Sequence, residues 1–370
     1  PCGRLGSPQQ GRSGSIGKQK PLTMIQINNL VRENVKQLVP YSAAREKYQG
    51  EEYVFLDANE NPFGRSLNRY PDPYQQALKE KIADLKGVET RQIFIGNGSD
   101  EIIDLLIRGF CNPGQDNMIV PEPTYGMYEV AGNINDVEVR KPQLTRDFQP
   151  DVDEILRNAD SNTKLIFLCS PNNPTGNLLN PQKIKEILDR FQGLVILDEA
   201  YIDFSGDQGF LPLLGQYSNL IILQTFSKAK GMAGIRLGYA FAIPEIIGIL
   251  NKIKYPYNVN RVTQKLALRK IKKQKQLQKK VKLINKEKER LIDFFENCSF
   301  VKHIFPSDAN FFLVKVSDPK ELVQFLADKR VIIRDRSGLP GCDKSVRVTV
   351  GKPTENNQLM KFCREFEKNT

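Results

Sequence analysis

The stretch that decides the fold reads TFSKAKGMAGIRLGY and occupies residues 225–239. It follows the apolar run NLIILQ at 219–224, which has the length and composition of a buried strand. An earlier run, GLVILDEAY at 193–201, has the same character. Two successive predicted strands therefore lead into polar groups, the first into Asp198 and the second into Lys228.

These residue types are the ones that pyridoxal phosphate chemistry requires. The cofactor forms an imine with a lysine and exchanges it for the substrate amine, while its protonated pyridine ring absorbs electrons. Lys228 is the predicted catalytic lysine, Asp198 the anion beside the ring nitrogen, and Tyr201 the hydrogen-bond partner of the ring hydroxyl. The cofactor phosphate needs hydroxyls, a cation and free backbone N–H groups, and Ser227 and Arg236 supply the first two.

Three further segments place polar or aromatic residues after predicted strands. GNGSDE at 96–101 opens a helical pattern, so that Ser99 and Asp100 occupy a helix N-terminus, where anions bind. Asn173, in CSPNNPTG, precedes a proline that keeps the chain extended. Tyr125, in PTYGMY, is placed to stack on a flat heterocycle.

Each motif alone has an ordinary explanation, as a capped helix start, a plain turn or a solvated Ser-Lys pair. Their order changes this interpretation, because four of these segments follow an apolar run of strand length and helical segments intervene. In an open parallel α/β sheet, the carboxyl ends of the strands converge on one crevice. The sequence therefore predicts an α/β fold with one cofactor site.

In this order, GNGSDE, PTYGMY, SPNNPTG, LDEAY and SKAKGMAGIRLGY resemble the fold-type I pyridoxal phosphate aminotransferases, and within them the histidinol-phosphate aminotransferases. LDANENPFG at 56–64 and VRVTVG at 346–351 extend the likeness, which covers the chain from about Val39 to its end. The resemblance implies a large domain with a mostly parallel sheet of the seven-stranded type, and a smaller α+β domain. It also implies transamination between histidinol phosphate and 2-oxoglutarate, giving imidazole acetol phosphate and glutamate, in histidine biosynthesis.

The resemblance assigns roles to further residues. Arg347 would bind the substrate α-carboxylate with assistance from Asn173. Tyr70 would reach the cofactor phosphate of the neighbouring subunit, in a homodimer with shared active sites. The candidates for binding the substrate phosphate are Arg334, Tyr41 and Tyr257.

Several alternatives stay open. Lys230 is a second amine where the family more often has an aromatic or apolar residue, although the spacing to Arg236 favours Lys228. Arg334 could be an ordinary ion-pair partner of Asp335. Related enzymes that act on aromatic amino acids or decarboxylate threonine phosphate share the cofactor motifs. The non-enzyme alternative is a regulator that binds pyridoxal phosphate without turnover.

Composition excludes other kinds of site. His303 is the single histidine, so a histidine-based triad and a multi-histidine metal site are excluded, and His303 itself is predicted to be structural. The six cysteines show no metal-ligand spacing and predict reduced thiols and a cytoplasmic protein. No apolar run approaches the ~20 residues that span a bilayer, so no membrane partner is expected.

A chain of 370 residues with a net charge of +11 is long enough for two domains. Its basic charge is concentrated at 264–290, where apolar residues recur at helical spacing and predict one long helix with a solvated basic face rather than a nucleic-acid module. The predicted organisation is a flexible extension at 1–23, an N-terminal arm with part of the small domain at 24–66, a large cofactor-binding domain at 67–262, a connecting basic helix at 263–290 and a C-terminal small domain at 291–370.

Overall fold

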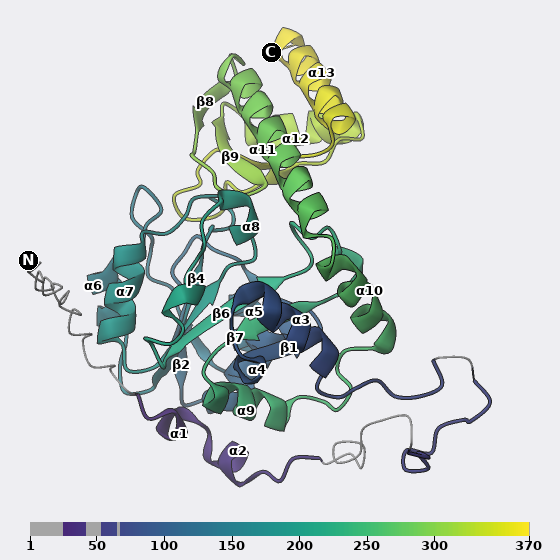
Figure 1. The fold of residues 1–370 in the computed structure, drawn as a ribbon. Helices are drawn as coiled ribbons and strands as arrows, with labels where there is room; N and C mark the ends of the chain where they lie inside the picture. The colour runs from purple at the N-terminus through teal and green to yellow at the C-terminus, as the bar shows by residue number, and fades with distance from the viewer. Residues whose placement is uncertain (1–24, 42–52, 65–66, 370) are drawn as a thin grey trace, which may run out of the picture.

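The computed structural model of the chain describes residues 25–41, 53–64 and 67–369. Its centre is a seven-stranded sheet with the strand order β1-β7-β6-β5-β4-β2-β3 (Figure 1). Neighbouring strands from β6 through β3 in this order run parallel, whereas β7 is antiparallel to both β1 and β6. The predicted α/β class with a mostly parallel sheet is therefore confirmed. The strands are β1 Ile93–Gly96, β2 Asn117–Ile119, β3 Glu138–Arg140, β4 Thr163–Cys169, β5 Leu194–Asp198, β6 Leu220–Thr225 and β7 Gly238–Phe241.

Helices cover both faces of this sheet because alternate residues of its central strands point to opposite faces and most of them are apolar and buried. In β5, Leu194 and Ile196 join one hydrophobic cluster and Val195 and Leu197 join another. The first cluster is covered by α4 Ser99–Phe110, α5 Met127–Ile134 and α9 Pro244–Ile253. The second is covered by α3 Gln76–Lys86, α6 Val152–Arg157, α7 Pro181–Arg190 and α10 Arg261–Ile271. Shorter helical segments are η2 Thr90–Gln92, α8 Ile202–Ser205, η3 Leu211–Leu213 and η4 Ala233–Ile235.

A second, smaller unit has its own sheet and core, seen at the top of Figure 1. Its four strands pair antiparallel in the order β10-β11-β9-β8. Helices α11, α12 and α13 contribute buried residues to its core. Its elements are α11 Gln274–Glu296, β8 Val301–Ile304, β9 Phe311–Val316, α12 Pro319–Asp328, β10 Arg334–Asp335, β11 Ser345–Thr349 and α13 Pro353–Asn369.

The N-terminal segment differs from its prediction. Residues 24–66 were expected to contribute to the small domain. Instead, α1 Ile27–Leu30 and α2 Glu33–Gln37 pack on the large unit, where Ile27, Val31 and Val35 share a core cluster with α4 and α9. Residues 1–23 lie outside the described part of the chain.

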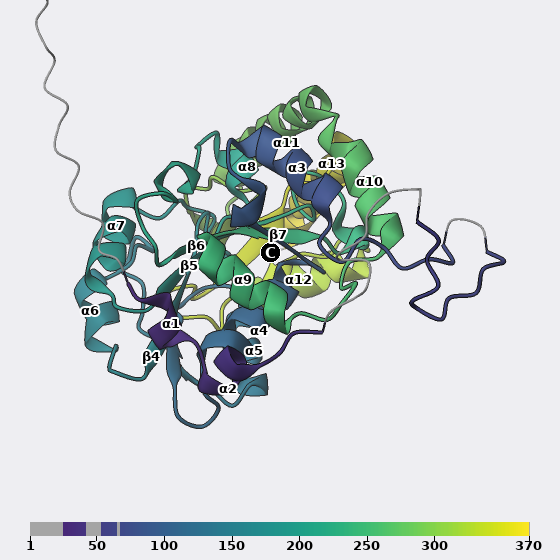
Figure 2. The ribbon, with the colours of Figure 1, turned by 60° about the horizontal axis from the view of Figure 1, so that its bottom comes forward.

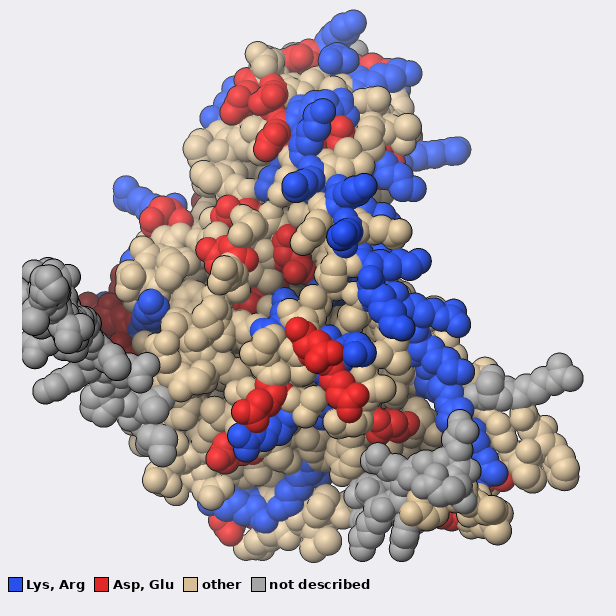
Figure 3. Space-filling model, in the orientation of Figure 1, with Lys and Arg blue, Asp and Glu red and all other residues tan. Residues whose placement is uncertain are grey.

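The basic segment expected as one helix over 263–290 forms two helices, α10 and α11, which are separated at Lys272 and Lys273. The predicted apolar stripe is present, since Leu277 and Leu291 are buried. Figure 3 shows the basic side chains as a continuous blue band along these helices. None of the described helices is both long and apolar enough to cross a membrane.

Candidate active site

A pocket opens where β4, β5 and β6 end and α4 begins. Every predicted cofactor-binding residue except Tyr70 lines it, so the fold brings together residues that are far apart in the sequence. Their individual roles remain predictions. We call this space the lysine pocket, and its lining residues are Ser99, Asp100, Tyr125, Cys169, Asn173, Asp198, Ala200, Tyr201, Thr225, Ser227, Lys228 and Arg236.

Asp198 is the buried anion of the lysine pocket. It is the last residue of β5 and only 3% exposed. Its Oδ2 accepts a hydrogen bond from the hydroxyl of Tyr128 at 2.7 Å, and its Oδ1 accepts one from the backbone N–H of Ala200 at 3.0 Å. Burial raises the pKa of Asp198 above its ordinary value, and these two hydrogen bonds oppose that rise. A cation brought beside this carboxylate would therefore be stabilised.

The two candidate lysines point into different surroundings. Lys228 lines the pocket, with its Nζ 5.3 Å from the centre of the Tyr201 ring. Burial lowers the pKa of Lys228, which favours the neutral amine that acts as a nucleophile or base. Lys230 has a side chain only 4% exposed and forms an ion pair with Asp203 at 2.8 Å. Lys230 is not among the residues that line the lysine pocket.

The start of α4 and Arg236 together form one end of the lysine pocket. Gly98 precedes the helix with a φ of +82°, and a Cβ there would lie 2.7 Å from Nη2 of Arg236. Gly238 allows β7 to approach the first turn of α4 closely, since a Cβ at Gly238 would lie 2.4 Å from the backbone N of Ser99. Arg236 forms an ion pair with Asp100 at 3.0 Å. Backbone N–H groups of a helix N-terminus beside an arginine are suited to binding a phosphate.

The small sheet places three arginines beside the pocket. Arg334 and Arg347 are directly paired across β10 and β11, and Arg336 follows two residues later, so all three project from the same face. Arg347 donates from Nη1 to Oδ1 of Asn173, which lines the pocket, and its guanidinium lies 5.3 Å from the ring centre of Phe311. Hence β11 reaches the site in the large unit.

This arginine cluster, Arg334, Arg336 and Arg347, has no acidic partner in the described residues, since none of them forms an ion pair there. In particular, Arg334 does not pair with Asp335. The Nε atoms of Arg336 and Arg347 are buried without a hydrogen-bond partner among the same residues. Burial first, and then the neighbouring arginines, lower the pKa of both guanidinium groups. Asp335 acts on Arg336 only through space, so positive charge without an ion-pair partner remains, and it favours an anionic ligand.

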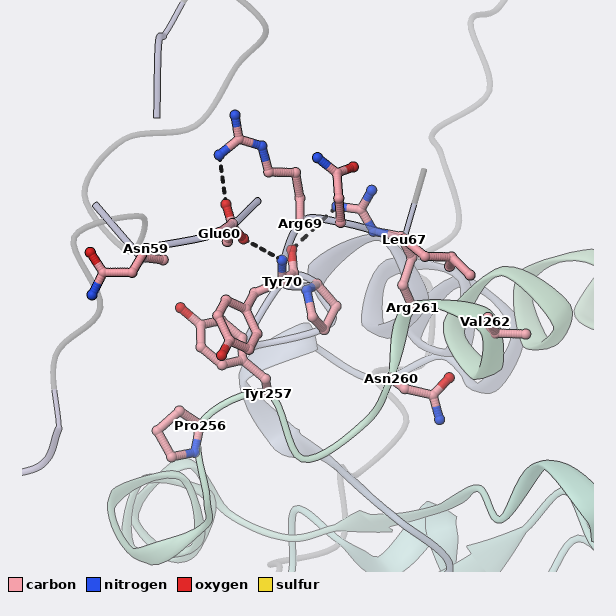
Figure 4. A pocket seen from close by; sticks show the side chains of 13 residues that line it. Asn59, Glu60, Leu67, Arg69, Tyr70, Pro256, Tyr257, Asn260, Arg261 and Val262 are labelled. Carbon is pink, nitrogen blue, oxygen red and sulfur yellow. Dashed lines mark hydrogen bonds and ion pairs between the residues drawn. The ribbon is translucent and has the colours of Figure 1, made fainter. Parts of the chain in front are cut away.

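Tyr70 and Tyr257 lie in a different hollow. Their rings stack with centroids 4.5 Å apart and planes inclined by 15°. Figure 4 shows them in a pocket that also includes Arg69 and Arg261, and the backbone N–H of Tyr70 donates to Glu60. We call this pocket the tyrosine groove; its lining residues are Ala58, Asn59, Glu60, Leu67, Asn68, Arg69, Tyr70, Pro71, Pro256, Tyr257, Asn260, Arg261 and Val262.

Neither Tyr70 nor Tyr257 lines the lysine pocket of its own chain, and neither does Tyr41, which is exposed. Of the five tyrosines predicted to touch cofactor or substrate, Tyr125 and Tyr201 line the lysine pocket, whereas these three are not brought to it within one chain. The segment that carries Tyr70 extends away from the body of the molecule before α3 begins (Figure 2).

The sequence of the chain matches the family model for class I and II aminotransferases over residues 48–362. It is 51% identical to the histidinol-phosphate aminotransferase of Parabacteroides distasonis, over 93% of this chain and 100% of that protein. The corresponding enzyme of Bacteroides fragilis is 50% identical, over 92% and 99% of the two chains. The crystal structure of the histidinol-phosphate aminotransferase from Clostridium acetobutylicum superposes with a TM-score of 0.76 at 27% identity, covering 82% of this chain and 92% of that one.

The chain belongs to the class I and II aminotransferases. The cofactor of this family is pyridoxal 5'-phosphate, and the lysine pocket of the present aminotransferase fits that molecule. Lys228 supplies an amine, and the buried Asp198 supplies an anion for the ring nitrogen. Arg236 and the start of α4 supply donors for the phosphate.

Cys169, Ala200 and Thr225 line the lysine pocket of this aminotransferase but were not predicted from the sequence. Two residues that act on the site from outside this lining were also missed. Tyr128 is the second tyrosine of PTYGMY, one helical turn after Tyr125, and this spacing could have indicated that both rings face the sheet. Arg336 lies two residues after Arg334, a spacing that puts both on one face of a strand. In each case the sequence does not show which strand packs against the residue, namely β5 with Asp198 for Tyr128 and β11 with Arg347 for Arg336.

Proposed function

We propose that this aminotransferase transfers an amino group between histidinol phosphate and 2-oxoglutarate in histidine biosynthesis. Relatives with about half of their residues identical over nearly their whole length are histidinol-phosphate aminotransferases. The observation that carries the proposal is the arginine cluster, which leaves three guanidinium groups beside the lysine pocket without an acidic partner in the described residues. A phosphate-bearing substrate would provide the missing negative charge.

Residues of the lysine pocket would have separate roles in this reaction. Pyridoxal phosphate, when bound, withdraws electrons from the substrate carbon that loses its proton. Lys228 Nζ would hold the cofactor, and once the substrate amine has replaced it, would remove that proton and return it at the other end. Asp198 would hold positive charge at the ring nitrogen, and Tyr201 would hydrogen-bond the ring hydroxyl.

The two substrates require different anionic contacts at the same site. Arg347 has a planar guanidinium that suits a carboxylate and is held by Asn173, so we assign it to the α-carboxylate of glutamate. Arg334 lies on the next strand and is exposed, so it would bind the phosphate at the far end of histidinol phosphate. Tyr41 and Tyr257 remain candidates for the same phosphate, in which case they would act from a second subunit.

A homodimer with shared active sites is part of this proposal. Exposed apolar side chains gather on the segment before α3, among them Val54, Leu56, Phe63 and Leu67. Apolar residues exposed together usually become covered by a partner surface. Placing this segment against a second copy would bring Tyr70 towards the phosphate end of that copy's lysine pocket.

We also assign the enzyme to the cytoplasm. All five cysteines in the described part of the chain are buried and free, which fits a reducing compartment.

The substrate assignment can be tested with the purified enzyme and four amino donors, namely histidinol phosphate, histidinol, phenylalanine and threonine phosphate. We expect histidinol phosphate to give the highest kcat/KM, with 2-oxoglutarate as the acceptor. A higher value for phenylalanine, or release of carbon dioxide from threonine phosphate, would transfer the assignment to an aromatic aminotransferase or a decarboxylase.

The variant Arg334→Ala tests the phosphate contact within the same assay. A charge-assisted contact contributes about 1.5–3 kcal/mol, so kcat/KM for histidinol phosphate should fall about tenfold to a hundredfold while that for histidinol changes little. Arg364→Ala, on α13, is a control for loss of one positive charge from the small unit. Equal losses for both substrates in Arg334→Ala would show that Arg334 does not bind the phosphate.

A further inference from the structure

Tyr128 is completely buried, with aromatic neighbours against its ring. It lies in the first turn of α5, and none of its surface is exposed. Its ring stacks on Phe167 of β4 with centroids 5.0 Å apart, and Tyr125 packs edge-on against it at 5.5 Å. Because both neighbours hold the ring, the hydroxyl is directed at Oδ2 of Asp198, 2.7 Å away.

The two hydrogen bonds to Asp198 come from neutral donors, the Tyr128 hydroxyl and the Ala200 N–H. A buried carboxylate needs hydrogen bonds to remain ionised, and neutral donors supply them without cancelling its charge. A lysine or arginine in direct contact would neutralise the carboxylate instead. Lys228 and Asp100 act on Asp198 only through space and with opposite signs, and the buried Cys169 thiol is also near. The negative charge of Asp198 therefore remains available to a bound cation.

We propose that Tyr128 is a positioning residue for Asp198: its hydroxyl orients the carboxylate, and stabilises its ionised form, towards the ring nitrogen of the cofactor. This inference rests on the proposed function, in which Asp198 faces that nitrogen. Without the hydroxyl, Oδ2 would lose its donor, the carboxylate would become more basic, and the proton shared with the ring nitrogen would move towards Asp198. The ring would then withdraw electrons less effectively.

The test is the variant Tyr128→Phe, which keeps the ring packing on Phe167 and removes only the hydroxyl. Holoenzyme is prepared with pyridoxal phosphate labelled with ¹⁵N in the ring, and the chemical shift of that nitrogen reports whether it carries a proton. We expect a protonated nitrogen in the wild type and a shift towards the neutral pyridine value in Tyr128→Phe. The dissociation constant of the cofactor should also rise, because a carboxylate that holds the proton itself attracts the ring nitrogen less strongly.

Tyr239→Phe is the matched control. Tyr239 is 1% exposed, and its hydroxyl also donates to a buried acceptor, Oε1 of Gln224. Its ring belongs to the core cluster on the opposite face of the sheet from Asp198, where Gln224 donates to Glu199. Both variants should lower the melting temperature to a similar extent, and only Tyr128→Phe should move the ¹⁵N signal. An unshifted ¹⁵N signal in folded, cofactor-loaded Tyr128→Phe would overturn the proposal.

A double-mutant cycle with Asp198→Asn distinguishes action through Asp198 from a general packing effect. If Tyr128 acts through the carboxylate, Tyr128→Phe should change cofactor binding little once Asp198 is replaced. An undiminished effect in the Asp198→Asn background would contradict the inference. A wild-type enzyme that binds no labelled cofactor would instead overturn the proposed function, and with it the basis of this inference.

Discussion

Two adjacent carboxylates, Asp198 and Glu199, have opposite environments because side chains alternate across a strand. Asp198 faces the lysine pocket in phase with Leu194 and Ile196. Glu199 points to the other face, where it accepts hydrogen bonds from the backbone of Phe210 at 2.7 Å and from Gln224 at 2.8 Å. The sequence predicted Asp198 as a carboxylate at a strand end, and this residue lines the lysine pocket, but the sequence could not show what surrounds Glu199.

Glu199 makes stability depend on pH. Burial raises its pKa from 4.5 to about 7. Between these values the folded state binds the proton and the unfolded state does not, so stability falls as pH rises through this window. Glu199→Gln lacks this titrating group, so only the wild type loses stability as the pH rises. The free energy of unfolding of the variant, minus that of the wild type, should therefore increase by about 2–3 kcal/mol from pH 5 to pH 8. Urea unfolding of both proteins at the two pH values measures this. A difference that is independent of pH would show that Glu199 does not titrate there.

At the scale of elements, the motifs predicted which strands and helices carry the site, because each motif joins a strand end to a turn or helix start. The pairing of elements was less predictable. The direct pairing of Arg334 with Arg347 depends on the register of β10 and β11, which neither strand encodes alone. The separation of α10 from α11 occurs at Lys272 and Lys273, two residues with good helix propensity, so local sequence gave no indication of it.

The turn into α4 gives a prediction with a close control. Gly98→Ala places a Cβ at φ +82° and 2.7 Å from Arg236, whereas Gly87→Ala, at the end of α3, places one at φ +69° with no atom within 4 Å. Gly87→Ala should destabilise the fold by about 1 kcal/mol, because its backbone is left-handed helical with a ψ of 34°. Gly98→Ala should cost more, about 1–3 kcal/mol, because a ψ of 167° puts Gly98 in a region that essentially only glycine adopts. Only Gly98→Ala should also weaken cofactor binding, because it displaces Arg236 from the phosphate end. Equal cofactor affinity in the two variants would mean that the turn does not shape that end.

At the scale of the whole molecule, the small unit completes a site that the large unit begins, since Arg347 of β11 contacts Asn173 after β4. Tyr70, by contrast, lies in the tyrosine groove and outside the lysine pocket of its own chain. A resemblance to a family suggested that Tyr70 serves a second subunit. One chain cannot reveal this, because the contacts that would show it lie between two copies.

Hybrid dimers test this arrangement. Tyr70→Ala and Lys228→Ala should each be inactive or nearly so. After subunit exchange, a hybrid dimer would have one site with both residues intact, so an equal mixture should recover up to about a quarter of wild-type activity. Mixing Lys228→Ala with itself under the same conditions is the control. A mixture that stays inactive, with exchange verified by mass spectrometry, would mean that Tyr70 acts within its own chain.

The central claim is that Lys228 is the amine that binds pyridoxal phosphate. It is tested most directly by reducing the holoenzyme with borohydride, digesting it and locating the modified lysine by mass spectrometry. Lys228 lines the pocket, while Lys230 is held in an ion pair with Asp203, so the cofactor mass should be found on Lys228 alone. The modification should disappear in Lys228→Ala. Finding the cofactor on Lys230, or on no lysine of a protein that binds it, would contradict the account.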